Sequence, residues 1–252
     1  MPNPHLQGWF AASVPKAGSR AAENEDATVA DAKRVRFAIA DGATEGWQSG
    51  GWARHLAKAY VDQPPGPPDF TNWLDAARTA WAPPTPKAER WYTEEKAEQG
   101  SFATLLGLEF RLATDPPGLV WKAVAVGDSC LFVIRNEKLE VAFPLTDAAA
   151  FGNEPPLVPS ATDRECPEPD WLAGWSEPGD LFLMATDAVA RFILKAGEAA
   201  IGSHPIVKIA LQSVASGTAA PTVELLESLK AKLNDDASIV AVRVAEDRRS
   251  TR

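Results

Sequence analysis

One stretch of the chain decides the fold: VRFAIADGATEGWQSGGWAR, residues 35–54. Apolar side chains alternate over its first five positions, as in a buried strand, at Val35, Phe37 and Ile39. The strand would place Asp41 at its end, and Gly42 would let the backbone come close to whatever that carboxylate holds. Apolar residues then recur at helical spacing. The stretch therefore predicts a strand, a tight acidic loop and a helix.

Acidic residues stand at the ends of five apolar runs in this sequence. A carboxylate at a strand end beside a glycine is a common way to place a hard metal ligand, although a single one is also typical of a solvated turn. The five acids are Asp26, Asp41, Asp128, Asp187 and Asp235. If these ends meet in space, the carboxylates repel one another unless cations neutralise them. The recurrence therefore favours a metal site.

Composition limits the other classes of function. The chain has 252 residues, 45% of them hydrophobic, which predicts a large core in one domain over residues 1–252. A net charge of −9 argues against nucleic acid or an anionic membrane as the main partner. Cys130 and Cys166 lie far apart and indicate no disulfide framework, and we expect Cys130 to be a buried apolar residue. With neither signal peptide nor membrane span expected, the predicted location is the cytoplasm.

Periodicity predicts strands that alternate with a few amphipathic helices. Strands are expected over 9–14, 27–30, 35–40, 101–112, 119–126, 130–135, 139–145, 180–186 and 239–244. Helices are expected from the loop after Asp41 to residue 62, and over 70–81, 90–97, 188–195, 205–216 and 221–233. Residues 146–178 are rich in proline and are expected to be irregular, and residues 246–252 to form a charged tail.

Six short motifs follow one another along the chain. They are Arg20 with Asn24-Glu25-Asp26, Asp41-Gly42, Gly100-Ser101-Phe102-Ala103-Thr104, Gly127-Asp128-Ser129, Ala185-Thr186-Asp187 and Asp235-Asp236-Ala237-Ser238. In this order and rough spacing they resemble the metal-dependent protein phosphatases of the PP2C family, over nearly the whole chain. The resemblance implies an α+β fold: an α/β/β/α sandwich of two antiparallel sheets flanked by helix pairs, with the metals at one end.

The resemblance also implies a site and an activity. Its metal-binding positions correspond here to Glu25, Asp26, Asp41, Gly42, Asp128, Asp187 and Asp235. Asp41 would bridge two ions, and Arg20 would bind the phosphate. Oxygen ligands without His or Cys favour Mn²⁺ or Mg²⁺, and two such ions can acidify a water that attacks phosphorus. The expected enzyme is a serine/threonine protein phosphatase whose partner is a phosphorylated protein, with a monomer as the default expectation.

Several positions depart from the family pattern. One extra residue separates Arg20 from Asn24, Ala43 stands where animal members have histidine, and Ala188 replaces a usual glycine. Arg191 replaces an acid that helps to hold a third ion, so we expect two ions without a well-occupied third. Two alternatives remain open: a catalytically weak PP2C-like binding module, and a phosphatase of small phosphoesters. Residues 146–178 are either a substrate-choosing flap beside the site or a plain surface loop.

Overall fold

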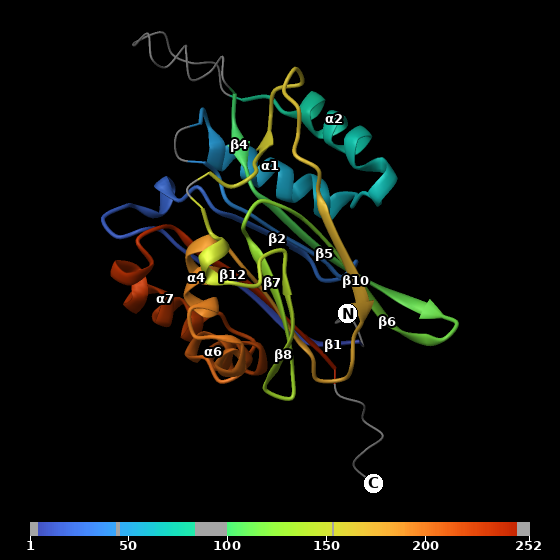
Figure 1. Cartoon of the computed structure of the whole chain (residues 1–252), viewed down its shortest axis with the longest axis vertical. Coiled ribbons are helices and arrows are strands. Elements are labelled where there is room, and N and C mark those ends of the chain that lie inside the picture. Colours follow the sequence, from blue (N-terminus) through green and yellow to red (C-terminus); the bar gives the residue numbers. More distant parts are fainter. Residues whose placement is uncertain (1–4, 44–45, 84–99, 153, 246–252) are drawn as a thin grey trace.

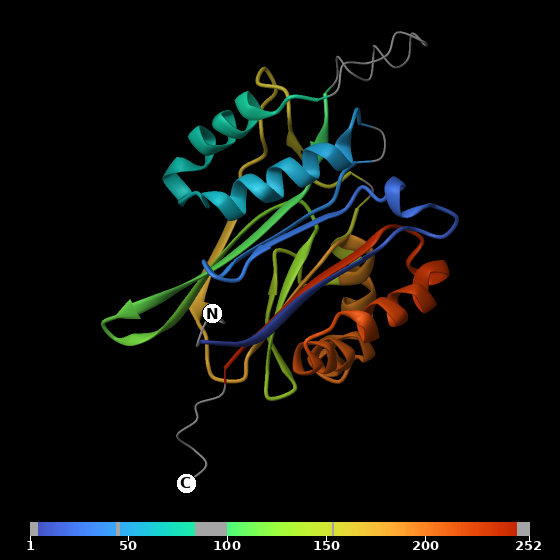
Figure 2. The same cartoon turned by 180° about the vertical axis from the view of Figure 1, so that it is seen from behind.

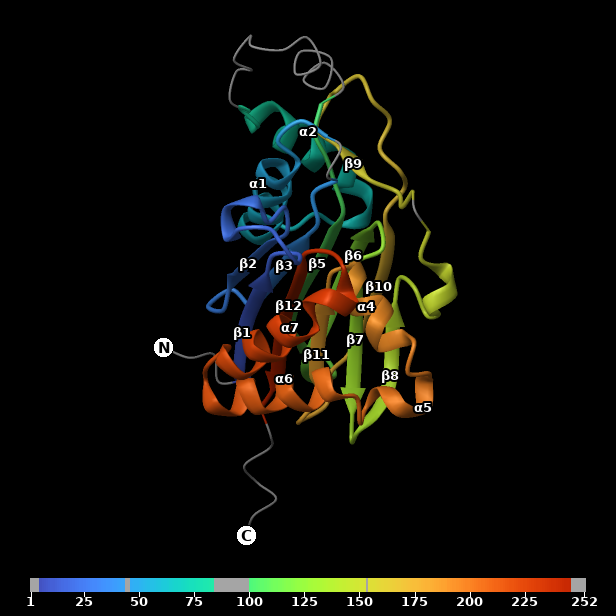
Figure 3. The same cartoon turned by 90° about the vertical axis from the view of Figure 1, so that its left-hand side faces the viewer.

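The computed structural model describes residues 5–43, 46–83, 100–152 and 154–245. Two large antiparallel sheets lie face to face, and helices cover the outer face of each (Figure 1). The side view separates the helix, sheet, sheet and helix layers (Figure 3). The predicted α/β/β/α sandwich is therefore confirmed.

Each sheet has five strands, and every neighbouring pair is antiparallel. The first sheet has the order β1 (Leu6–Val14), β12 (Ala237–Val244), β11 (Leu181–Ala185), β7 (Cys130–Arg135) and β8 (Lys138–Phe143). The second has the order β10 (Asp170–Trp175), β6 (Pro117–Val126), β5 (Leu105–Thr114), β3 (Arg36–Ala40) and β2 (Ala27–Asp31). A small third sheet pairs β4 (Phe102–Ala103) with β9 (Val158–Pro159).

The main core lies between the two large sheets. In β3, Phe37 and Ile39 point into this core, whereas Ala38 and Ala40 face the helices. This is the alternation expected of a strand with two buried faces. Phe110 of β5 meets Phe182 of β11 edge to face across the interface, with ring centroids 4.8 Å apart. Apolar side chains of both sheets thus fix the spacing of the sandwich.

Helices close the two outer faces. The second sheet is covered by α1 (Ser49–Asp62) and α2 (Phe70–Ala80), and the first by α4 (Asp187–Leu194), α6 (Pro205–Ser216) and α7 (Ala220–Leu233). The short α5 (Glu198–Ile201) lies beside β8. Tyr60 of α1 packs over Gly107 of β5, where an added Cβ would stand 2.3 Å from the tyrosine ring. Only glycine therefore lets α1 approach the sheet this closely.

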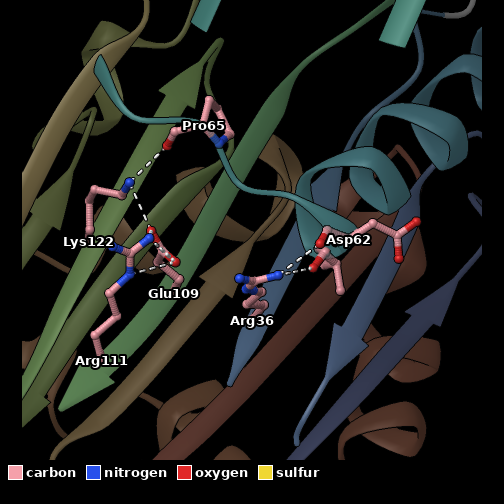
Figure 4. A network of polar contacts seen from close by, with 7 residues as sticks. Arg36, Asp62, Pro65, Glu109, Arg111 and Lys122 are labelled. Carbon is pink, nitrogen blue, oxygen red and sulfur yellow. Dashed lines mark hydrogen bonds and ion pairs between the residues drawn. The ribbon is translucent and has the colours of Figure 1, made fainter. Parts of the chain in front are cut away.

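A polar network ties the connection between α1 and α2 to the second sheet (Figure 4). Glu109 is 2% exposed and forms ion pairs with Lys122 at 2.8 Å and Arg111 at 3.0 Å. Lys122 Nζ also donates to the Pro65 carbonyl at 2.8 Å. Nearby, Arg36 donates to the Asp62 carbonyl at 2.9 Å. The view from behind shows the β5–β6 hairpin projecting from one side of the sandwich (Figure 2).

Nearly all the predicted elements lying in described residues are present, with shifts of a few residues at their ends. Three differences stand out. The strand expected over 101–112 is interrupted at Thr104, residues 146–178 contain the edge strand β10, and α5 was not expected. The helix expected over 90–97 and the tail 246–252 lie outside the described residues. In the described part of the chain, no helix is long and apolar enough to cross a membrane.

Candidate metal centre

The strands and loops carry the predicted acids to one end of the sandwich. Asp41 directly follows β3, Asp128 lies between β6 and β7, Asp187 begins α4 after β11, and Asp235 precedes β12. These four line a cavity of about 680 Å³. The full lining is Asp41, Gly42, Ala43, Gly46, Phe102, Thr104, Asp128, Gly152, Glu154, Pro155, Leu157, Asp187, Arg191, Asp235 and Asp236.

The backbone of Asp41 is held from both sides by Thr104. The Asp41 amide donates to Thr104 Oγ1 at 2.9 Å, and the Thr104 amide donates to the Asp41 carbonyl at 2.8 Å. Thr104 Oγ1 also bonds Ser129 Oγ at 3.0 Å. A Cβ added to Gly42 would stand 2.6 Å from the Ser49 carbonyl carbon, so glycine is required there. These bonds explain both the interrupted strand at Thr104 and the fixed position of Asp41.

Asp26 is 6% exposed and is absent from the described lining of this cavity. Thr186 Oγ1 donates to its Oδ2 at 3.0 Å. Its Oδ1 is buried, and no described residue supplies it with a hydrogen-bond partner. Burial, followed by the charge of Asp236, raises the pKa of Asp26 to about 7. An unpartnered buried carboxylate oxygen beside other acids is the kind of atom that a cation satisfies.

The acids influence one another most strongly at Asp41. Burial raises the pKa of Asp41 well above its usual range, and the negative charges of four other carboxylates add to this increase: Asp26, Asp187, Asp235 and Asp128. Burial and the charge of Asp187 raise the pKa of Asp128 to about 7. Burial also raises the pKa of Asp187. The five predicted aspartates therefore form one electrostatic group centred on Asp41.

The donor set fits hard divalent cations. The side chains in the described cavity lining that could bind a metal are carboxylates, and neither His nor Cys belongs to that lining. Hard divalent cations prefer such oxygen ligands. Among the described residues, no three carboxylate, imidazole or thiolate side chains stand close enough to hold one ion as placed. Cations bound here would relieve the repulsion among these carboxylates and would give the unpartnered Oδ1 of Asp26 a partner.

Asp236 has a role that the sequence analysis missed. Its carboxylate is 4% exposed and accepts the Lys16 amide on one oxygen at 2.7 Å and the Glu25 amide on the other at 2.8 Å. Asp236 thus fastens both ends of the loop that leads to Glu25 and Asp26. The paired acids Asp235-Asp236 were visible in the sequence, but only the fold shows which backbone groups the second one meets.

Arg20 is placed differently from the other candidates. Its side chain is 88% exposed, and its guanidinium is 3.8 Å from Glu23 in the same short 3₁₀ turn, η1 (Ala21–Glu23). It is absent from the described lining of the cavity.

Burial raises the pKa of Cys130 to about 12, so this thiol is protonated and buried, as expected.

Comparison with known proteins gives the fold. Neither a family model nor a curated protein matches the sequence. Among solved structures, the catalytic domain of the serine/threonine protein phosphatase PstP in complex with two manganese ions matches with a TM-score of 0.59 and 19% identity. The match covers 94% of this chain and 98% of that one. The chain therefore has the fold of the PP2C, or PPM, serine/threonine phosphatases.

Two further structures agree. The PPM Ser-Thr phosphatase MsPP from Mycobacterium smegmatis, in complex with cacodylate, matches with a TM-score of 0.56 and 16% identity, over 96% of this chain and 100% of that one. RsbX in complex with magnesium matches with a TM-score of 0.53 and 15% identity, over 96% of this chain and 97% of that one. At such identities the likeness concerns the fold.

Proposed function

We propose that this protein is a Mn²⁺- or Mg²⁺-dependent phosphatase that hydrolyses phosphoserine and phosphothreonine. The observation that carries the proposal is the convergence on Asp41 of the charges of four other aspartates, around an open cavity. The similarity to PstP with two manganese ions and to RsbX with magnesium supports the choice of metals.

Each residue in the site has a distinct task. Bound as a pair, the divalent ions would supply positive charge and activate a water for attack on phosphorus. Asp41 would be shared by both ions, since it lies at the centre of the electrostatic group. Asp26 and Asp187 would be further ligands of the ions, and Thr104 would hold Asp41 in place through its two hydrogen bonds to the Asp41 backbone. Glu25, Gly42, Asp128 and Asp235 remain the other proposed ligand positions.

A phosphorylated protein is the proposed substrate. The cavity is open, and residues 152, 154, 155 and 157 of the proline-rich region form part of its lining beside the acids. A flexible phosphorylated segment can therefore reach the acids from outside, and this proline-rich region can contact it.

We propose a cytoplasmic location, where cysteines stay reduced; Cys130 and Cys166 are both free, which agrees with it.

The binding-module alternative rests on the departures at Ala43, Ala188 and Arg191. Ala43 and Arg191 both line the cavity. The five aspartates grouped around Asp41 are all retained, and for this reason we favour an active enzyme. A small phosphoester as substrate is the second alternative, and preference for a phosphopeptide over a generic aryl phosphate decides between the two substrates.

Metal titration tests the proposal. Hydrolysis of an aryl phosphate and of a phosphopeptide is measured after chelation and then with increasing Mn²⁺. We expect activity only with metal, and an increase in melting temperature with Mn²⁺, because the ions bind the folded state. Asp41→Asn should abolish activity and leave the fold intact. Asp62→Asn, an exposed acid at the end of α1, is the matched control. Substantial turnover by Asp41→Asn at saturating Mn²⁺ would refute the proposed role of Asp41.

A further inference from the structure

The cavity holds one positive charge among many negative ones. Its described lining contains six carboxylates and a single cation, Arg191. Divalent ions would satisfy the carboxylates, whereas the guanidinium of Arg191 would be repelled by those same ions. Because the ions would occupy these carboxylates, Arg191 would remain free to pair with an anionic ligand in the cavity.

The helix α4 brings Arg191 beside the acids. The helix begins at Asp187, and a residue four positions later lies on the same helix face one turn further along. Both side chains line the cavity, and the charge of Arg191 lowers the pKa of Asp187, against the larger effect of burial. Arg191 is exposed, and none of the ion pairs formed among the described residues includes it. Its guanidinium is therefore available to a ligand in the cavity.

The other cations near this end of the sandwich are less suitable. Arg20 is paired with Glu23 and lies outside the cavity lining. Lys16 Nζ stands 4.0 Å from Asp235, and its backbone amide is bound to Asp236. Neither side chain is part of the described cavity wall.

We propose that Arg191 binds the phosphoryl oxygens of the substrate, the task that sequence resemblance gives to Arg20. This inference rests on the proposed function. A planar guanidinium can donate two parallel hydrogen bonds to two oxygens of one phosphate, a geometry that an ammonium group cannot match. The substrate phosphate would thus lie between the ions held by Asp41 and Asp187 on one side and Arg191 on the other.

The proposed role also gives a reason for arginine, instead of the acid that the resemblance implies, at position 191. An acidic residue one turn after Asp187 would add a ligand for a further cation. Arginine supplies a fixed positive charge from the protein itself, at the same helix position. The chain would in this way stabilise the negative charge of the phosphate with two ions and one guanidinium, without requiring a third ion.

Phosphate affinity is the decisive measurement, because it does not depend on turnover. Binding of inorganic phosphate to the Mn²⁺-loaded protein is measured by calorimetry for the wild type, Arg191→Gln, Arg191→Lys and Arg20→Gln. Lys195→Gln is the matched control, since Lys195 directly follows α4, is exposed and lies outside the described cavity lining. Lys195→Gln removes one positive charge, as Arg191→Gln does.

Arg191→Gln should weaken phosphate binding about tenfold, which corresponds to ~1.4 kcal/mol. The phosphate affinity of Arg191→Lys should lie between those of Arg191→Gln and the wild type, because lysine keeps the charge and loses the paired donors. The KM for a phosphopeptide should rise in parallel. Binding of Mn²⁺, followed through the melting temperature, should not weaken, because no ligand is removed. Lys195→Gln should match the wild type in all of these measurements.

Three results would overturn the assignment: unchanged phosphate affinity in Arg191→Gln, equal losses in Arg191→Gln and Lys195→Gln, or a loss that appears in Arg20→Gln instead. Failure of the proposed function gives a different result. A wild type that binds Mn²⁺ and phosphate but hydrolyses no phosphoester would refute the enzyme, while the calorimetric comparison would still decide whether Arg191 binds the anion.

Discussion

Replacing Asp26 by asparagine should make the metal-free protein more stable at pH 8, although the substitution alters a buried polar residue. The side chain is 6% exposed, its Oδ2 accepts one hydrogen bond from Thr186, and its Oδ1 has no partner among the described residues. An ionised carboxylate in that environment is disfavoured by burial and by its acidic neighbours. Asparagine has a similar shape and removes the charge.

The expected size follows from the pKa of Asp26, which rises from 3.8 to about 7 on folding. The folded protein therefore holds this proton more tightly than the unfolded chain does. The resulting stabilisation is complete below pH 3.8 and is lost as the pH rises through about 7. A shift of this size corresponds to about 4 kcal/mol, at 1.36 kcal/mol for each pKa unit. An unpaired amide costs about 1–3 kcal/mol, which leaves a net gain for Asp26→Asn of roughly 1–3 kcal/mol at pH 8.

Urea denaturation in the presence of a chelator, followed from pH 4 to pH 8, measures this difference. Wild-type stability should fall across that range more steeply than that of Asp26→Asn, and the two curves should cross, with the wild type the more stable protein near pH 4 because the unpaired amide of the variant costs free energy at every pH. Added Mn²⁺ should reverse the order at pH 8, since only the wild type keeps the carboxylate. Parallel pH profiles, or a variant that is less stable at pH 8 without metal, would refute the reasoning.

Three further substitutions test separate parts of the structure. Asp236→Asn leaves one acceptor oxygen for two backbone amides, so we expect a loss of about 1–2 kcal/mol in unfolding free energy and a smaller increase in melting temperature with Mn²⁺; an unchanged response to Mn²⁺ would contradict this. Asp187→Ala should reduce the same increase without unfolding the protein, and a full response would argue against its role as a ligand. Asp180→Ala removes the buried partner of Arg135, paired at 2.8 Å, and should cost about 3–5 kcal/mol with or without metal; a cost that disappears with Mn²⁺ would contradict the purely structural role of Asp180.

Local patterns in the sequence were sufficient for most of the secondary structure. Alternation predicted β3, because its two faces meet different cores and both exclude water. The sequence pattern did not predict the edge strand β10, because its residues are of mixed polarity and lie at the margin of the sheet. Only its pairing with β6 defines it as a strand. The acids at strand ends were also visible, because a carboxylate after an apolar run is a local feature.

The sequence by itself determined most of the elements that form and that five aspartates stand at the ends of apolar runs. The tertiary structure decided which side chains share the cavity. Arg20 lies in a motif of the expected type, yet its side chain points to solvent, whereas Arg191, read as a departure, lines the cavity. Asp236 meets an amide 220 positions away in the sequence. Contacts of this kind depend on how the sheets and helices pack and on side-chain direction, and no local periodicity records them.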